Sequence, residues 1–212
     1  MDAGEEETDM NALEKALMAA REEGELISLQ GFGRETAQSL DFSDLTFRQA
    51  RFQGCQFLGC DFSAAAFYDC EFQDCAFLSC RLAGSFWKDS ALTDCKAEGA
   101  DFRKSRFKDC ALSGSRLRYA NLTGALWDRC TLSDCDLTES TCQELKIVKT
   151  TLRKTDFTGA DLFRAALKGI DLSGCTLDGI SLSASCQELK GAKIHASQAA
   201  VAARILGIEI VE

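Results

Sequence analysis

An apolar residue recurs at every fifth position, in one unbroken register, from Phe42 to Leu182. Of the 29 positions in this register, only Ala97 and Cys142 are not large apolar residues. A period of five matches neither the 3.6-residue period of an α-helix nor the two-residue alternation of a flat strand. A chain that turns a corner every five residues satisfies this period, because each repeat then points its central residue inward.

The residues around each central position support this interpretation. The residue two positions before the centre is mostly Ala, Cys, Ser or Thr, and the residue just before it is often Asp, Asn, Gln or Arg. By strand alternation, the small residue and the central residue both point inward, and the residue between them points outward. The two remaining residues of each repeat form the turn, where Ser, Thr and Gly are frequent.

Segments such as Ala120-Asn121-Leu122-Thr123-Gly124 and Ala160-Asp161-Leu162 resemble the pentapeptide-repeat family, whose consensus is written A(D/N)LXX. The resemblance implies an all-β solenoid, a right-handed quadrilateral β-helix in which four repeats, or 20 residues, form one coil. The repeats of this chain would then make about seven coils, which stack to roughly 35 Å at the spacing of paired strands.

The five-residue register does not extend to either end of the chain. We assign residues 1–30 to an acidic N-terminal segment with a capping helix, residues 31–195 to the β-helix, and residues 196–212 to a C-terminal helix and strand. Within 10–23, Leu13, Leu17, Met18 and Ala20 share one side at helical spacing. This helix is expected to cover the first coil, and recruitment of another protein is the alternative.

The C-terminal segment follows a slip of two residues in the register after Leu182. Ala-rich helical sequence then runs to Leu206, Gly207 is a natural helix C-cap, and residues 208–211 are typical of a short strand. Residues 189–212 resemble the tail of the bacterial quinolone-resistance pentapeptide-repeat proteins and, more loosely, the albicidin-immunity member. In that group the tail joins two solenoids, which implies a homodimer here, with an interface at Val201, Ile205, Leu206, Ile208, Ile210 and Val211.

The sequence offers little that supports catalysis, a metal site or a cofactor. The single histidine, His195, has no evident nucleophile beside it, and a structural role is expected. Ten of the twelve cysteines occupy the small inward position of a repeat, and no C-x-x-C pair typical of zinc sites occurs. We therefore expect each cysteine to act as a small buried hydrophobe.

Most of the net charge of −9 comes from the N-terminal segment, because residues 1–25 hold nine acids and two bases. One face is net basic, but direct binding to DNA needs a stronger basic excess and is not expected. Its central residues are Phe47, Phe67, Trp87, Phe107, Trp127, Ile147 and Leu167. One acidic face stands out in the C-terminal half, with Asp136, Glu139, Asp156 and Asp178. The neighbouring acids Asp134 and Asp171 extend it across a corner. It is either a surface that mimics DNA or a solvated face with chance clustering.

Two functions remain open. The resemblance implies a cytoplasmic homodimer that binds a bacterial type II topoisomerase, DNA gyrase first and topoisomerase IV second, as a DNA-mimicking rod and protects it from quinolones or natural gyrase poisons. The alternative is a non-enzymatic scaffold that binds an unrelated protein, because fold alone implies no function. No apolar stretch is long enough to cross a membrane, and the acidic N-terminus is unlike a signal peptide.

Overall fold

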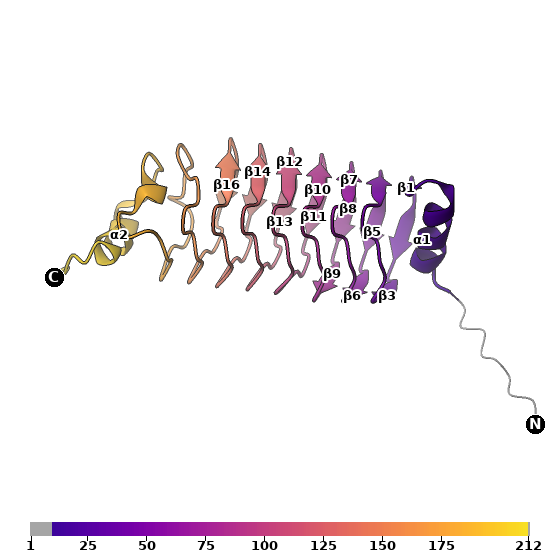
Figure 1. Cartoon of the computed structure of the whole chain (residues 1–212). Helices are drawn as coiled ribbons and strands as arrows, with labels where there is room; N and C mark the ends of the chain where they lie inside the picture. Colours follow the sequence, from indigo (N-terminus) through magenta and orange to yellow (C-terminus); the bar gives the residue numbers. More distant parts are fainter. Residues whose placement is uncertain (1–9, 212) are drawn as a thin grey trace, which may run out of the picture.

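The chain forms an elongated rod of stacked coils with a short helix at each end (Figure 1). This computed structural model describes residues 10–211. Each coil has four sides, which we call faces I to IV in chain order, and residues 20 apart stack on one another, as Phe47 does on Phe67. The predicted all-β, right-handed quadrilateral β-helix is confirmed, with a short helix at its N-terminal end and another at its C-terminal end.

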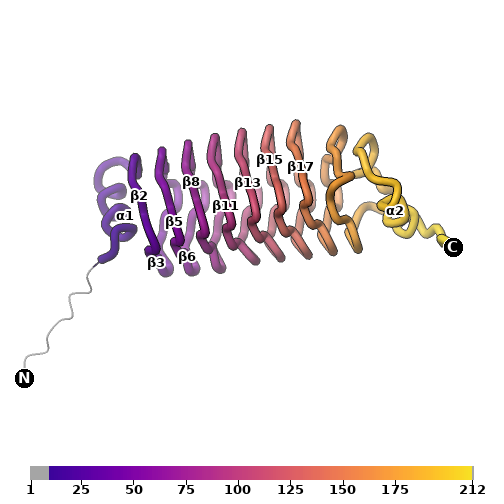
Figure 2. Tube along the Cα trace, turned by 180° about the vertical axis from the view of Figure 1, so that it is seen from behind, coloured from indigo at the N-terminus to yellow at the C-terminus, as the bar shows by residue number. Residues whose placement is uncertain are grey.

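Three faces carry parallel sheets of three-residue strands. Face I holds seven strands: β1 (Leu26–Ser28), β4 (Thr46–Arg48), β7 (Ala66–Tyr68), β10 (Phe86–Lys88), β12 (Arg106–Lys108), β14 (Leu126–Asp128) and β16 (Lys146–Val148). Face II holds seven more, shown in order along the rod in Figure 2: β2 (Gly31–Gly33), β5 (Arg51–Gln53), β8 (Glu71–Gln73), β11 (Ala91–Thr93), β13 (Ala111–Ser113), β15 (Thr131–Ser133) and β17 (Thr151–Arg153). Face III begins with β3 (Thr36–Gln38), β6 (Gln56–Leu58) and β9 (Ala76–Leu78) and continues, as face IV does throughout, through isolated parallel bridges.

The corners explain the polar preferences of the repeat. The second turn residue has a positive φ at almost every corner, as at Asp44 (60°) and Glu139 (54°), a conformation that Gly, Asn and Asp adopt most readily. At many corners an Asp or Asn just before the central residue accepts a hydrogen bond from the N–H two residues later. Asn121 Oδ1 accepts from Thr123 in this way, at 3.1 Å. The Asp or Asn of the repeat is therefore a turn-forming residue.

The core is a set of side-chain stacks that run along the rod. Aromatic rings fill its N-terminal half, where Phe52 and Phe72 lie 4.4 Å apart between centroids and are nearly parallel. Such pairs contribute about 0.5–1.5 kcal/mol each beyond their burial. Eleven of the twelve cysteines are buried, and all are free thiols. Burial raises the pKa of Cys135 to about 11, and the cysteines are the small hydrophobes predicted from the repeat.

The first coil begins earlier than the assigned boundary at residue 31. Strand β1 starts at Leu26, and Ile27, Phe32 and Ala37 are buried in the same five-residue register. The inward slots of this coil hold Glu25, Gln30 and Glu35 in place of small residues, which hid the repeat in the sequence.

Helix α1 (Ala12–Glu23) covers the N-terminal end of the rod. Asn11 caps it in a capping box with Glu14, and the side-chain amide of Asn11 also donates to the carbonyl of Thr36, at 2.7 Å. The buried residues of the helix are Leu13, Ala16 and Ala20, whereas Met18 is exposed, so the apolar side differs in part from the expectation. Arg21 donates to two carbonyls of the first coil, those of Asp41 and Ser43, which have no coil before them to pair with.

The C-terminal end is closed by two polar side chains and a short helix. The register slip is seen in the bridge between Asp171 and Lys193, which are 22 residues apart. Glu188 is buried and accepts from the N–H of Arg164 at 2.8 Å, and Gln198 donates to the carbonyl of Cys175 at 2.6 Å. These contacts replace the next coil, which the rod lacks.

Two 3-10 turns precede the C-terminal helix: η1 (Gln187–Leu189), where the register shifts, and η2 (Ala196–Gln198). Helix α2 (Ala199–Ile205) directly follows η2. Residues 208–211, expected as a strand, form no strand in this single chain. A strand needs an edge to pair with, and these residues lie beyond the last coil. No helix in the described part of the chain could cross a lipid bilayer.

Candidate protein-binding surfaces

The acidic face lies on face III of the C-terminal half and along the neighbouring edge of face II. Asp136 and Asp156 are direct neighbours on adjacent coils of face III, joined by a parallel bridge. Glu139 and Asp178 belong to the turns of the same face. The structure therefore brings together the four acids that the sequence assigned to this face. Asp134 and Asp171 lie on face II.

Two of these carboxylates also have a structural role. Asp136 Oδ1 accepts from both the N–H and the hydroxyl of Thr138, at 2.9 and 2.5 Å, and Asp156 Oδ1 does the same with Thr158. Each carboxylate keeps its second oxygen for other partners. Glu139 is exposed, and its side chain has neither a hydrogen bond nor an ion pair within residues 10–211.

Cations contact the edge of the acidic face, which the sequence analysis did not anticipate. Arg118 Nε lies 3.8 Å from Asp136 Oδ2, and Lys154 Nζ lies 3.7 Å from Asp134 Oδ1. Hydrogen bonds from Ser173 and the charge of Lys193 lower the pKa of Asp171. The 20-residue spacing of Asp134 and Lys154 would have revealed one of these pairs. The central part of the face keeps its acidic excess, and its edges are partly neutralised.

The six apolar tail residues divide into two groups. Val201 and Ile205 pack against the core and cover the last coil, so they are largely occupied within their own chain. The other four are exposed to solvent at the end of the rod: Leu206 (50%), Ile208 (54%), Ile210 (50%) and Val211 (89%). A cluster of exposed large apolar side chains is typical of a surface that another molecule covers.

His195 has a structural role, as expected from its position. It caps the N-terminal end of η2, where its Nδ1 lies 2.8 Å from Ser197 Oγ and its backbone N–H donates to Gln198 Oε1 at 2.6 Å. Within residues 10–211, no group of three or more His, Cys, Asp or Glu side chains is placed to hold a metal ion. The surfaces with potential for recognition are therefore the charged faces of the rod and its apolar tail.

Comparison with known families agrees with the coil geometry. A family model described as a pentapeptide repeat region matches residues 38–100, and one described as pentapeptide repeats (8 copies) matches 115–153 and 148–179. Together they match more than half of the chain. The chain belongs to the pentapeptide-repeat family. No protein of curated function matches the sequence.

Several solved pentapeptide-repeat structures align with the chain. A trypsin-treated variant of QnrB1, a plasmid-mediated fluoroquinolone resistance protein, shares 22% identity over 88% of this chain and 97% of its own, with a TM-score of 0.48. HetL of Nostoc sp. strain PCC 7120, involved in heterocyst differentiation regulation, shares 18% identity over 87% and 97%, with a TM-score of 0.36. Rfr23 of Cyanothece 51142 shares 13% identity over 87% and 100%, with a TM-score of 0.26. Similarities at this level carry no argument about function.

Proposed function

We propose that this pentapeptide-repeat protein is a non-catalytic cytoplasmic homodimer that binds a bacterial type II topoisomerase, DNA gyrase foremost and topoisomerase IV second, in the place of DNA. In this role it protects the enzyme from quinolones or natural gyrase poisons. The observation that carries the proposal is the set of acids on face III, close to the end of the rod that carries the exposed tail. A dimer joined at its tails would combine two such sets into one longer acidic surface.

Geometry and charge support this role. Stacked coils repeat their side chains at about 4.8 Å, so Asp136 and Asp156 place two negative charges one coil apart along the rod. The partner would be a positively charged DNA-binding cleft, and opposite charges would guide the rod into it. The tail resemblance to quinolone-resistance proteins agrees with this partner.

A supercoiling assay tests the proposal. Purified gyrase is titrated with the protein, with and without a quinolone, and complex formation is followed by gel filtration. We expect a complex and either inhibition of supercoiling or its rescue from the drug. The proposal fails if none of these is seen.

Paired asparagine variants connect the effect to face III. Asp136→Asn with Asp156→Asn removes two charges but keeps the turns, because Asn121 already makes the same turn in this chain. The matched control, Asp61→Asn with Asp101→Asn, changes the same repeat position on face IV. We expect only the face III variant to weaken the effect, by about three- to tenfold. Equal losses in both would show that face III is not the contact surface.

A scaffold for an unrelated protein is the second candidate, and a specific observation favours it. The ion pairs of Arg118 and Lys154 reduce the acidic excess at the edge of the surface, and the turns already use one oxygen of Asp136 and of Asp156. In this case the main role of these acids would be to form the turns and ion pairs of the fold, not to bind a topoisomerase. The gyrase titration separates the two functions, since a scaffold for another partner would form no complex with gyrase.

A further inference from the structure

Face I, on the opposite side of the rod from the acidic face, carries a row of cations that the proposed function does not use. Five of the six are exposed and one, Lys108, is half-buried. None of the six forms an ion pair within residues 10–211. We call this surface the lysine strip, and it consists of Arg106, Lys108, Lys146, Lys149, Lys168 and Lys190.

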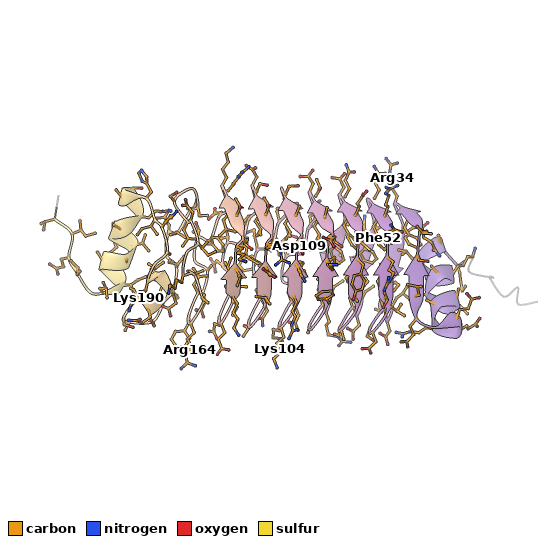
Figure 3. All side chains as sticks on the ribbon, turned by 90° about the horizontal axis from the view of Figure 1, so that it is seen from above. Arg34, Phe52, Lys104, Asp109, Arg164 and Lys190 are labelled. Atoms are coloured by element: carbon orange, nitrogen blue, oxygen red, sulfur yellow. The ribbon has the colours of Figure 1, made fainter. Side chains whose placement is uncertain are left out.

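The register slip places Lys190 in this strip. The bridge between Asp171 and Lys193 shows that residues 22 apart stack here, which aligns Lys190 with Lys168. The glycines that follow these lysines, Gly169 and Gly191, have matching φ values of 81° and 78°. A Cβ on Gly191 would lie 3.3 Å from Lys168 Cγ, so the two turns are in contact. The strip therefore continues to the C-terminal end of the rod, where Figure 3 shows Lys190.

The acids within the strip are already paired with other cations. Arg129 binds Asp109 through two contacts, Nε to Oδ1 at 2.6 Å and Nη2 to Oδ2 at 2.9 Å, and its Nη1 lies 3.0 Å from Asp128 Oδ2. One guanidinium therefore satisfies the two carboxylates that would otherwise neutralise the lysines. The six cations of the strip remain available to an external anion.

The strip combines this charge with a flat surface and an apolar centre. Its middle part lies on strands β12, β14 and β16. Val148 is 43% exposed, lies two residues after Lys146 and stacks on Asp128 of the preceding coil. From the coil of Arg106 to that of Lys190 there are four steps, which span roughly 19 Å at the spacing of paired strands. An extended chain of about six residues has the same length.

We propose that the lysine strip binds an acidic, extended polypeptide segment of a partner protein, with carboxylates opposite the lysines and an apolar side chain against Val148. This surface and its partner are separate from the face proposed to bind a topoisomerase. A protein segment is favoured over a nucleic acid for two reasons. Exposed Val148 offers an apolar contact to a polypeptide side chain and nothing to a phosphate. Five of the six cations are lysines, whereas arginine is the residue preferred for phosphate recognition.

Fluorescence anisotropy with the full chain tests the proposal. The probe is a fluorescein-labelled peptide of alternating Glu and Val, about eight residues long to cover the strip. A Lys-Val peptide of the same length and a single-stranded DNA oligonucleotide serve as comparison probes. We expect only the Glu-Val peptide to bind, with an affinity that falls as salt is added, because exposed ion pairs are screened.

A charge-reversal pair with a matched control locates the binding. The test variant is Lys146→Glu with Lys168→Glu, and the control is Lys96→Glu with Lys104→Glu, which are also exposed and unpaired within the described residues but lie on faces III and IV. Glutamate already occupies equivalent repeat positions, at Glu71, Glu98 and Glu144, so both variants should fold. We expect about tenfold weaker binding in the test variant only.

Three results would overturn the proposal. The first is an equal loss of affinity in both variants, which would indicate a general charge effect. The second is tighter binding of the DNA oligonucleotide than of the Glu-Val peptide, which would make the strip a nucleic-acid surface. The third is self-association of the chain that the test variant abolishes in sedimentation, which would make the acidic face of a second copy the occupant.

Discussion

Three successive coils of face I differ in whether a buried tryptophan N–H or serine hydroxyl has a hydrogen-bond partner. Ser85, Ser105 and Ala125 stack at the same inward position and are all fully buried. Trp87 Nε1 donates to Ser85 Oγ at 2.9 Å, whereas the buried Nε1 of Trp127 finds only Ala125 at the equivalent place and has no partner among residues 10–211. The hydroxyl of Ser105, in the coil of Phe107, is also buried and has no partner in the described part of the chain.

These environments predict opposite effects from three one-atom changes. Ser85→Ala leaves the Trp87 N–H unsatisfied and should lower the free energy of unfolding by about 1–3 kcal/mol. Ala125→Ser supplies the missing acceptor to Trp127 and should raise it by about 1 kcal/mol. Ser105→Ala removes an unsatisfied hydroxyl and should be neutral or slightly stabilising, since no hydrogen bond is lost.

Chemical denaturation followed by tryptophan fluorescence measures all three, because Trp87 and Trp127 are the two tryptophans of the chain. The slope of the transition must stay constant across the variants for their midpoints to be compared as stability. Equal destabilisation by Ser85→Ala and Ser105→Ala would refute the reasoning, since packing alone would then decide the effect. A destabilising Ala125→Ser would refute it as well.

Three further predictions concern the C-terminal end. Cys186 is the one cysteine that is not buried, so a thiol reagent should label one site in the native protein and none in the Cys186→Ser variant. Burial alone would raise the pKa of Glu188, but hydrogen bonds from backbone N–H groups and the Ser183 hydroxyl lower it below its ordinary value of 4.5. Glu188 therefore stabilises the fold fully above pH 4.5, and this stabilisation is lost as the pH falls through the lowered pKa. In thermal melts, the wild-type protein should be more stable than Glu188→Gln at neutral pH, and the difference should disappear at acid pH. Ile208→Asp with Ile210→Asp should convert the proposed dimer into a folded monomer in sedimentation, and an unchanged mass would contradict the proposed tail-to-tail assembly.

The five-residue period predicted most of the fold. In a stacked coil the central residue of each repeat forms the core, and its spacing also determines which strands pair. The start of the first coil, before residue 31, was missed because the inward slots of this coil hold Glu25, Gln30 and Glu35. These larger polar side chains fit at the end of the rod, where Glu25 and Gln30 are exposed. The strand expected at 208–211 was inferred from its apolar residues, but a strand also needs a paired edge, which a single chain does not supply.

The charged surfaces were predicted in outline only. Residues 20 apart were placed correctly on shared faces, since the spacing alone decides this. Contacts between residues that are not 20 apart, such as Arg118 with Asp136, depend on how far a long side chain reaches around a turn. The sequence could not place Lys190 in the lysine strip, because the position of this residue depends on how the coil accommodates the two extra residues after Leu182.

The way the rod absorbs that slip has a consequence for how such a chain can change in evolution or by design. Two extra residues between Ser181 and Lys193 are accommodated in a local turn, while Asp171 and Lys193 still pair as neighbours in the stack. This corner therefore accepts two added residues while the face that follows it still pairs with the coil before. New loops could be grafted at corners of this rod one at a time, each changing what the surface recognises and leaving the stability of the remaining coils unaltered.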